Sequence, residues 1–252
     1  MKRKIKDIES MSLELSSPRV DLPTFSSELE SWLKNSVSAA VCVNVAEIDP
    51  VIKLHPEEEQ YVLNAVTARR AEFATGRYCA REILAKLGYA EIAIPVGPKR
   101  EPLWPKNISG SISHDQGIAV AVISADQHIS GLGIDLLGLE SRIDGTGSGL
   151  IADESEISSV GEMLHSVPGC EYQNANPLLL IFSAKESAIK AISPSLEHYL
   201  DFREIQIESR ANMLRARFLN FDTELDIHWR IIEEMIITFT LISPNSVPPD
   251  CL

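Results

Sequence analysis

Four short segments in the C-terminal part of the chain alternate apolar and polar side chains, and this pattern restricts the possible folds more than any other feature. They cover residues 205–209, 213–220, 225–232 and 235–242, and period-two alternation is typical of β-strands. Residues 178–192, just before them, have the spacing of an amphipathic helix. The C-terminal part is therefore expected to pack helix on a small antiparallel sheet.

The N-terminal part contains a similar mixture of elements. Residues 39–48 are predicted to form a strand, residues 56–87 a long charged helix that Gly88 ends, and residues 117–124 a buried strand. The pattern favours an α+β fold over an alternating βαβ series. The expected units are a loosely packed N-terminal extension over residues 1–35, a first lobe over 36–127 and a second lobe over 128–252.

The overall charge narrows the possible partners. The 252 residues include 23 Lys and Arg against 36 Asp and Glu, a net charge of −13, which disfavours nucleic acid or an anionic membrane as the main partner. The longest stretch without ionisable side chains, residues 235–249, is shorter than the about 20 residues of a membrane-spanning helix. The N-terminal segment lacks the apolar core of a signal peptide, and the four cysteines lack metal-ligand or disulfide spacing, so we expect a cytoplasmic protein.

Two carboxylates are candidates for a metal site. Asp135 lies inside the apolar segment GLGIDLL, where a charge is costly unless it is paired or bound to a cation. Glu186 lies four residues before Lys190 in FSAKESAIK, which taken alone is typical of a solvent-exposed ion pair on a helix. Mg²⁺ usually takes one or two protein carboxylates and completes its shell with water and phosphate oxygens, so this pair of carboxylates would be sufficient.

Basic side chains gather in two segments of this acidic chain. Residues 97–114 are rich in turns and, taken alone, are also typical of a basic surface loop. Residues 69–84 are predicted to be a helix with arginines close to one face. Their concentration of positive charge favours an anionic ligand such as a phosphate. The candidate contacts are Lys99, Arg100, Ser111, Ser113 and His114 in the first segment and Arg70, Arg77 and Arg81 in the second.

Several pieces of the sequence, taken in order, resemble one enzyme family. They are EFATGRYCARE, KREPLWP, GSISHD, GIDLL and FSAKES followed by a lysine, and they lie within residues 69–190. In combination they are similar to the 4′-phosphopantetheinyl transferase superfamily, in the large group that includes the surfactin-type enzymes and enterobactin synthetase component D. The resemblance implies two pseudo-symmetric α+β lobes, each a small antiparallel sheet packed with helices, with the active site between them.

The resemblance also implies a reaction and its partners. Such enzymes transfer the 4′-phosphopantetheine arm of coenzyme A to a serine of an acyl or peptidyl carrier protein, with Mg²⁺, and release adenosine 3′,5′-bisphosphate. The carrier would serve siderophore, peptide, polyketide or fatty-acid synthesis, and a monomer is expected. Because carrier domains of these pathways tend to be acidic, we expect a mainly apolar contact with a small basic rim.

Residues that match the family's motifs take their expected roles from the resemblance. Asp135 and Glu186 match metal ligands, and Glu186 is also a candidate general base for the carrier serine, directly or through water. With Glu186, the expected catalytic residues are Lys190, which would stabilise charge on the transferring phosphate, and Lys185, which would add charge or packing at the helix start. The expected coenzyme A contacts are Ser113 and His114, near the 3′-phosphate, and Arg70, Arg77, Lys99 and Arg100, while Arg81 is expected on the surface.

One position departs from the family's pattern. The family commonly reads GID-x-E, with the second acid as a third metal ligand, and this chain has Leu137 there. Water, the coenzyme pyrophosphate or Glu140 would fill the place, and weaker metal binding is predicted. Two alternatives therefore stay open: a non-catalytic module that binds coenzyme A or a carrier, and a Mg²⁺-dependent phosphohydrolase that uses water in place of the carrier serine.

Other prominent residues are expected to be structural. Cys79 is predicted to be a small buried residue, and Trp104 to pack a loop against the first lobe. Gly131 and Gly133 are expected to allow close backbone approach to their strand, because GLGID lacks the third glycine and the helix start of a dinucleotide-binding loop.

Overall fold

The computed structural model describes residues 20–143, 148–168 and 175–244 of the chain. The description therefore starts within the predicted N-terminal extension and stops before the last eight residues. The elements in chain order are α1 (Leu22–Ser36), β1 (Cys42–Glu47), η2 (Pro56–Val62), α2 (Thr67–Lys86), β2 (Ser109–Asp115), β3 (Ile118–Ser124), β4 (Gly131–Gly138), α3 (Ser148–Ile151), α4 (Glu154–Ser166), α6 (Pro177–Ile192), η3 (Ser193–Ser195), η4 (Phe202–Glu204), β5 (Ile205–Arg210), β6 (Met213–Phe218), β7 (Glu224–Ile232) and β8 (Met235–Ile242).

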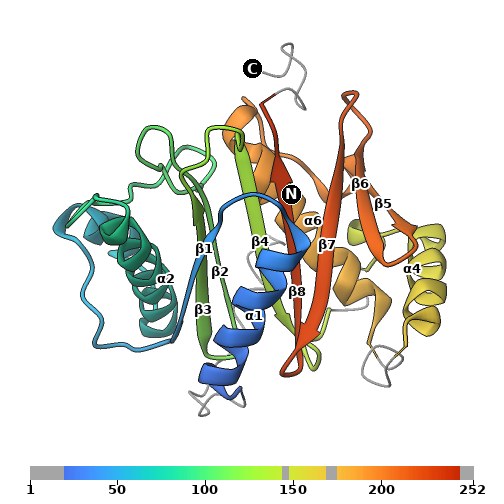
Figure 1. Cartoon of the computed structure of the whole chain (residues 1–252), viewed down its shortest axis with the longest axis horizontal. Coiled ribbons are helices and arrows are strands. Elements are labelled where there is room, and N and C mark those ends of the chain that lie inside the picture. Colours follow the sequence, from blue (N-terminus) through green and yellow to red (C-terminus); the bar gives the residue numbers. More distant parts are fainter. Residues whose placement is uncertain (1–19, 144–147, 169–174, 245–252) are drawn as a thin grey trace.

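The strands form two antiparallel sheets, which confirms the predicted α+β fold (Figure 1). The smaller sheet has the strand order β1-β3-β2, and the larger has the order β4-β8-β7-β6-β5. Strand β2 at the edge of the smaller sheet lies beside β4 at the edge of the larger one. The two sheets therefore meet along β2 and β4. The lobe boundary predicted at residue 127 falls in the connection between β3 and β4.

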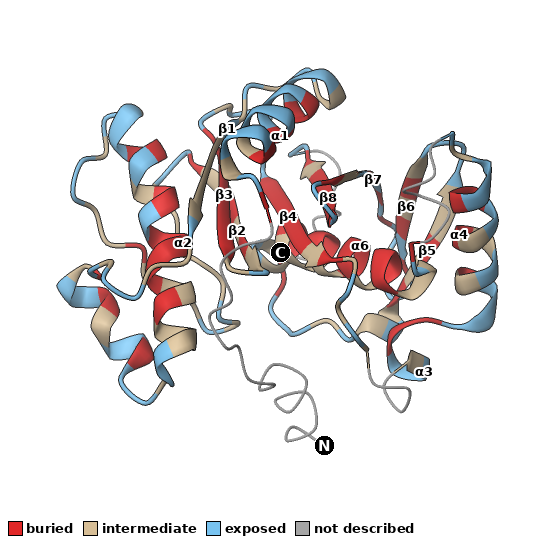
Figure 2. Cartoon of the chain, turned by 90° about the horizontal axis from the view of Figure 1, so that it is seen from below, coloured by how far each residue is buried: buried red, intermediate tan, exposed pale blue. Residues whose placement is uncertain are grey.

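Strand β3 is the centre of the smaller sheet, and every residue in it is buried. Ile118, Val120 and Val122 belong to a cluster shared with α1, while the intervening alanines belong to a cluster shared with α2. Successive side chains of a strand point to opposite faces, so the sheet is covered on both sides. Figure 2 shows the buried strand between these helices.

Helix α1 is part of the core, which corrects the expectation that this part of residues 1–35 is loosely packed. Phe25, Leu29, Trp32 and Leu33 are buried, and they pack with residues of both β3 and the larger sheet. Pro23 lies in the first turn, where its missing N–H removes no helical hydrogen bond. The helix therefore crosses from one sheet to the other and ties them together (Figure 1).

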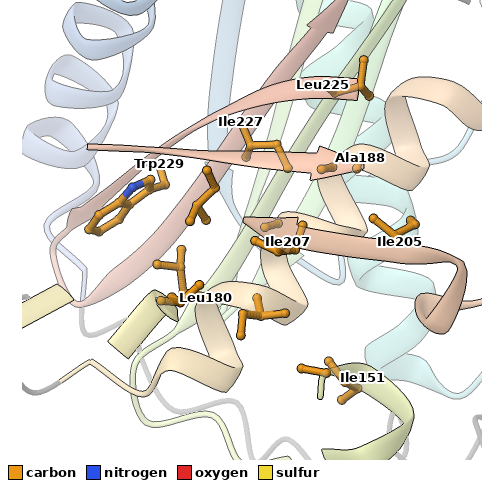
Figure 3. Packing of buried hydrophobic residues seen from close by; sticks show 14 of the residues in the cluster. Ile151, Leu180, Ala188, Ile205, Ile207, Leu225, Ile227 and Trp229 are labelled. Atoms are coloured by element: carbon orange, nitrogen blue, oxygen red, sulfur yellow. The ribbon is translucent and has the colours of Figure 1, made fainter. Parts of the chain in front are cut away.

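Helix α6 packs on the opposite face of the larger sheet from α1 (Figure 2). Its apolar side chains meet those of the strands and of α3 and α4 in one cluster. Figure 3 shows Leu180 and Ala188 of α6 beside Ile205 and Ile207 of β5 and Ile227 of β7. This packing fixes the helix that carries the predicted Glu186 and Lys190.

The predicted helix over residues 56–87 is two elements, η2 and α2, joined by residues 63–66. In one continuous helix, residues 58 and 81 would lie about 35 Å apart, at about 1.5 Å per residue. Instead the Glu58 carboxylate lies 2.7 Å from the Arg81 guanidinium, and Glu59 lies 2.6 Å from Arg70. These ion pairs hold η2 against the side of α2, which a straight helix does not allow.

Several smaller predictions are also settled. Cys79 is completely buried, and burial raises the pKa of its thiol to about 12, so it is a core residue. Trp104 packs on the cluster of the smaller sheet, as predicted, and lies against Gly110. None of the helices in the described residues is both long and apolar enough to cross a bilayer.

Candidate active site

Asp135 on β4 is a buried carboxylate whose two oxygens differ in their surroundings. The residue is 5% exposed. Its Oδ1 accepts a hydrogen bond from Ser113 Oγ at 2.9 Å and one from Lys190 Nζ at 2.6 Å. Its Oδ2 is buried and has no hydrogen-bond partner in the part of the chain that the structure describes. A buried carboxylate oxygen without a partner is costly, so a ligand for Oδ2 is expected.

Lys190 approaches this carboxylate from α6, the helix that also carries Glu186. Lys190 Nζ donates to Asp135 Oδ1, to Ser113 Oγ at 3.1 Å and to the backbone carbonyl of Ile134 at 3.2 Å. Glu186 lies one helical turn earlier and is partly exposed. Residues four apart lie on one face of a helix, so Glu186 is expected on the face of α6 from which Lys190 reaches β4.

Two glycines on β4 allow α6 to come this close. A Cβ atom at Gly133 would lie 2.8 Å from the carbonyl carbon of Ser187 and 2.9 Å from the backbone nitrogen of Ala191, and one at Gly131 would meet the backbone of Ala191. These separations are shorter than van der Waals contact. The predicted close backbone approach at both glycines is therefore confirmed, and it is an approach of α6 to the strand that carries Asp135.

Alternate side chains of β2 join the two sheets. Ser111 Oγ accepts from the Ile134 N–H at 3.1 Å, Ser113 Oγ from the Leu136 N–H at 3.1 Å, and an Asp115 oxygen from the Gly138 N–H at 2.7 Å. Backbone amides of β4 that would pair with a neighbouring strand are thus satisfied by side chains. The seam of side-chain bonds between β2 and β4 places Ser113 directly at Asp135.

A basic group, made of Arg69, Arg77 and His114, lies next to this seam. Burial, and then the charges of Arg69, Lys190 and Arg77, lower the pKa of His114 to about 3, so its imidazole is neutral at pH 7. Its Nε2 accepts from Arg69 Nη1 at 2.7 Å, and its Nδ1 lies 3.8 Å from the Glu72 carboxylate.

Arg77 is the most buried member of the basic group, at 6% exposure, and its guanidinium lies 4.0 Å from the centre of the Phe73 ring. Burial lowers its pKa to about 10, which leaves it charged at pH 7. Its Nε has no hydrogen-bond partner among the described residues. The basic group of Arg69, Arg77 and His114, beside Lys190, is suited to an anionic ligand.

Two profiles of known protein families match the part of the chain that contains these residues. The profile described as the 4′-phosphopantetheinyl transferase N-terminal domain matches residues 57–124. The profile described as the 4′-phosphopantetheinyl transferase superfamily matches residues 131–240. The chain belongs to the 4′-phosphopantetheinyl transferase superfamily. The second profile contains Asp135, Glu186 and Lys190, and the first contains the basic group.

Individual members of the superfamily are similar over different lengths. The 4′-phosphopantetheinyl transferase Svp of Streptomyces mobaraensis is 34% identical over 173 residues, 68% of each chain. The enterobactin synthase component D of Shigella flexneri is 30% identical over 172 residues, 68% of this chain and 76% of that protein. The 4′-phosphopantetheinyl transferase Npt of Nocardia iowensis is 34% identical over 96 residues, 38% of this chain and 42% of that protein. The chain thus spans less than half of Npt and about two thirds or more of the other two.

The residues around Asp135 fit the Mg²⁺ that the family implies. Oδ2 of Asp135 is buried and lacks a partner among the described residues, and Glu186 on α6 is the candidate second carboxylate. Within residues 20–143, 148–168 and 175–244, no group of three or more His, Cys, Asp or Glu side chains is arranged to hold a metal ion. Leu137 occupies the position of the family's third acid, and Glu140 is exposed on the loop after β4. A two-carboxylate site is sufficient for Mg²⁺.

Lys185 does not join the other predicted site residues. It is 1% exposed, and its Nζ lies 2.9 Å from the Glu156 carboxylate and donates to the carbonyls of Ile151 and Phe202. Five residues separate it from Lys190, which turns the two side chains about 140° apart on the helix. Lys185 therefore ties α6 to α3, α4 and η4 as a packing residue, and it does not lie with Asp135 and Lys190, where a catalytic residue was expected.

The predicted arginines are brought to different places. Arg77 lies in the basic group, but Arg70 is half-exposed and pairs with Glu59. Arg69, which the sequence analysis did not single out, takes the place beside His114. Arg81, expected on the surface, is mostly buried against Glu58, whose carboxylate is fully buried and also accepts from the Ile94 N–H.

The predicted Lys99 and Arg100 lie in a tight loop. The Gly97 N–H donates to the Glu101 carbonyl, and the Arg100 N–H donates to the Gly97 carbonyl at 2.9 Å. Lys99 is held by the Glu101 carboxylate through its N–H, at 2.8 Å, and its Nζ, at 3.6 Å, while Arg100 is exposed. Tyr199 of the C-terminal lobe donates to the Pro98 carbonyl at 2.8 Å. The loop is therefore ordered by its own bonds and by one bond from the other lobe.

Proposed function

We propose that the protein transfers the 4′-phosphopantetheine arm of coenzyme A to a serine of an acyl or peptidyl carrier protein and releases adenosine 3′,5′-bisphosphate. The main support is Asp135, whose buried Oδ2 has no partner among the described residues although Oδ1 has two. A carboxylate oxygen kept in this way beside Lys190 and Glu186 is suited to a bound cation and a phosphate.

The reaction breaks the bond between phosphorus and the oxygen of the nucleotide part and forms one between phosphorus and the serine oxygen. Such a displacement depends mainly on positioning and on neutralising charge. Asp135 and Glu186 would hold Mg²⁺, which supplies charge neutralisation at the pyrophosphate when bound. Lys190 adds a fixed positive charge 2.6 Å from Asp135 Oδ1.

Glu186 is our candidate acceptor for the proton of the carrier serine, directly or through water. It is partly exposed, whereas Asp135 is buried and bonded to Ser113 and Lys190. A base has to reach a hydroxyl group that arrives from another molecule, which favours the exposed member of the pair. The proton leaves the serine as the new oxygen–phosphorus bond forms.

The basic group would hold the nucleotide part of coenzyme A. Arg69 and Arg77 supply positive charge, and His114 orders Arg69 through the bond at its Nε2. Lys99 and Arg100, on the loop that Tyr199 contacts, are further candidates for phosphate contacts. Arg70 is the weaker candidate, because Glu59 already neutralises it.

The proposal extends to the partner and the setting. We infer a monomer that acts in the cytoplasm on carriers of siderophore, peptide, polyketide or fatty-acid synthesis. This chain has a net charge of −13, and the carriers of these pathways are expected to be acidic as well. Docking by long-range attraction is then disfavoured, and an apolar contact with a basic rim is expected.

The test is the intact mass of purified apo carrier domains after incubation with coenzyme A, Mg²⁺ and the protein. We expect a carrier to gain the mass of one phosphopantetheine group, and Asp135→Asn and Glu186→Gln to abolish the gain. Glu162→Gln, a change of the same kind at an exposed position on α4, is the control and should transfer normally. Coenzyme A binding without transfer to any carrier would favour the binding module, and release of phosphopantetheine without a carrier would favour the phosphohydrolase.

A further inference from the structure

Ser113 is the one β2 residue of the seam that also contacts the groups from β4 and α6 at the candidate metal site. It is 4% exposed. Its neighbours along the seam, Ser111 and Asp115, accept hydrogen bonds from backbone amides of β4 in the same way, but neither has a bond to Asp135 or Lys190 among those found in the described residues. Ser113 is therefore the point at which the seam meets the candidate metal site.

The hydroxyl group of Ser113 is fully used. A serine hydroxyl has one hydrogen to donate and two lone pairs that accept. Ser113 Oγ donates to Asp135 Oδ1 at 2.9 Å, and it accepts from the Leu136 N–H and from Lys190 Nζ, both at 3.1 Å. A phosphate oxygen of a nucleotide would need the one hydrogen that Asp135 already receives.

These bonds turn the Asp135 carboxylate into one orientation. Ser113 and Lys190 both bond to Oδ1, and Oδ2 is left buried without a partner in the described chain. Partners behind a metal ligand commonly fix its orientation and its basicity in this way. Because Ser113 Oγ also accepts a hydrogen bond from the Leu136 N–H, it holds the Asp135 carboxylate in a fixed position relative to the backbone of β4.

We propose that Ser113 is a positioning residue of the metal site, which fixes Asp135 and Lys190 relative to each other, and not a contact to the coenzyme A nucleotide. The inference rests on the proposed function in so far as Asp135 is taken as a metal ligand. It assigns to Ser113 a different task from the nucleotide contact expected from the resemblance. His114, the next residue, keeps its place in the basic group.

The experiment compares Ser113→Ala with Ser111→Ala in the full chain. Both changes remove a buried hydroxyl group from the same strand and leave one β4 amide without its partner at 3.1 Å. Only the first removes a bond to Asp135. Any general effect of weakening the seam should therefore appear in both variants, and a specific effect at the metal site in one.

The readouts are the affinity for Mn²⁺, used as a probe in place of Mg²⁺ and measured by calorimetry, and the affinity for coenzyme A in the presence of a chelator. We expect Ser113→Ala to weaken Mn²⁺ binding by about 10-fold or more, in the range known for partners behind metal ligands. Ser111→Ala should stay within about twofold of the wild type, and coenzyme A binding without metal should be unchanged in both variants.

The opposite pattern would overturn the proposal: normal Mn²⁺ binding and weakened coenzyme A binding in Ser113→Ala. If Asp135→Asn binds Mn²⁺ as tightly as the wild type, the proposal also fails, because Asp135 is then not a ligand. Ser113→Cys, which keeps a group of similar shape with weaker hydrogen bonds, provides the same comparison if the alanine variant does not fold. Since the readout is metal binding, it decides the role of Ser113 whether or not a carrier is modified.

Discussion

Replacing Gly133 by alanine should separate α6 from β4 and thereby take the candidate site apart. The added Cβ would lie 2.8 Å from the Ser187 carbonyl carbon, whereas two carbon atoms in contact are about 3.5 Å or more apart. The helix backbone must therefore move by about 0.7 Å or more, since a carbonyl group inside a helix cannot rotate away. Overpacking of this kind costs about 1–3 kcal/mol, and contact with the backbone of α6 at both Ser187 and Ala191 favours the upper value.

At about 2–4 °C per kcal/mol for a chain of this size, the loss corresponds to a fall in Tm of about 6–12 °C. The same shift moves Glu186 and Lys190 away from Asp135, and a displacement near 1 Å can lower a rate by about 100-fold. Thermal unfolding and phosphopantetheine transfer measure the two effects. Gly149→Ala is the matched control, because its Cβ would meet nothing within 4 Å. Gly133→Ala with wild-type Tm and wild-type transfer would refute the close approach of α6 to β4.

Three further predictions concern single side chains. Lys185→Met leaves Glu156 buried without its cation, so the free energy of unfolding should fall by about 3–5 kcal/mol. The fraction of the protein that is folded should still transfer phosphopantetheine. Selective loss of transfer at normal stability would contradict this and show a direct role of Lys185 in the reaction. Leu137→Glu places an acid two residues from Asp135 on the same face of β4, so it should tighten Mg²⁺ binding in a metal titration. Equal or weaker Mg²⁺ affinity would refute the idea that the site lacks a ligand because of Leu137. His114 has a pKa of about 3 when folded and near 6.5 when unfolded, so the unfolded state binds more protons between these values. Stability therefore falls as pH drops through this window, by up to about 1.4 kcal/mol per pH unit. His114→Gln should therefore show a shallower fall in Tm between pH 6 and pH 4, and an unchanged slope would contradict the neutral imidazole.

The strands could be predicted because their pattern is local. Residues 205–242 alternate with period two, and β5 to β8 form where this alternation was found. Helix α1 also has a local signal, since Phe25, Leu29, Trp32 and Leu33 follow a helical spacing. Charged and serine-rich neighbours obscured it, and only the two sheets underneath explain why it is buried.

The candidate site was predictable where motifs are short and not where the chain folds back on itself. Asp135, Lys190 and His114 were each singled out from their own segments, and the structure brings them to adjacent positions. The pair of Arg81 and Glu58 joins residues 23 positions apart, so no periodicity marks it. Arg70 was singled out with Arg77 and Arg81 because spacings of seven and four residues favour one helix face. Its pairing with Glu59, which lies outside the helix, has no such mark in the sequence.

The seam between β2 and β4 is beyond any pattern in the sequence. It depends on side chains of one strand bonding to the backbone of another across two sheets. The orientation of Lys185 could have been read from helix geometry, because five residues turn it about 140° away from Lys190. Its buried partner Glu156 lies on another helix.

The central claim is that Asp135 and Glu186 hold a divalent cation beside a basic group that holds the phosphates of coenzyme A. The most direct measurement is a crystal structure of the full chain with coenzyme A and Mn²⁺, whose anomalous signal locates the metal. The account predicts one metal peak at Asp135 Oδ2 and Glu186, with the pyrophosphate next to it and the nucleotide phosphate at Arg69 and Arg77. A metal peak away from Asp135, or coenzyme A bound at another surface, would contradict it.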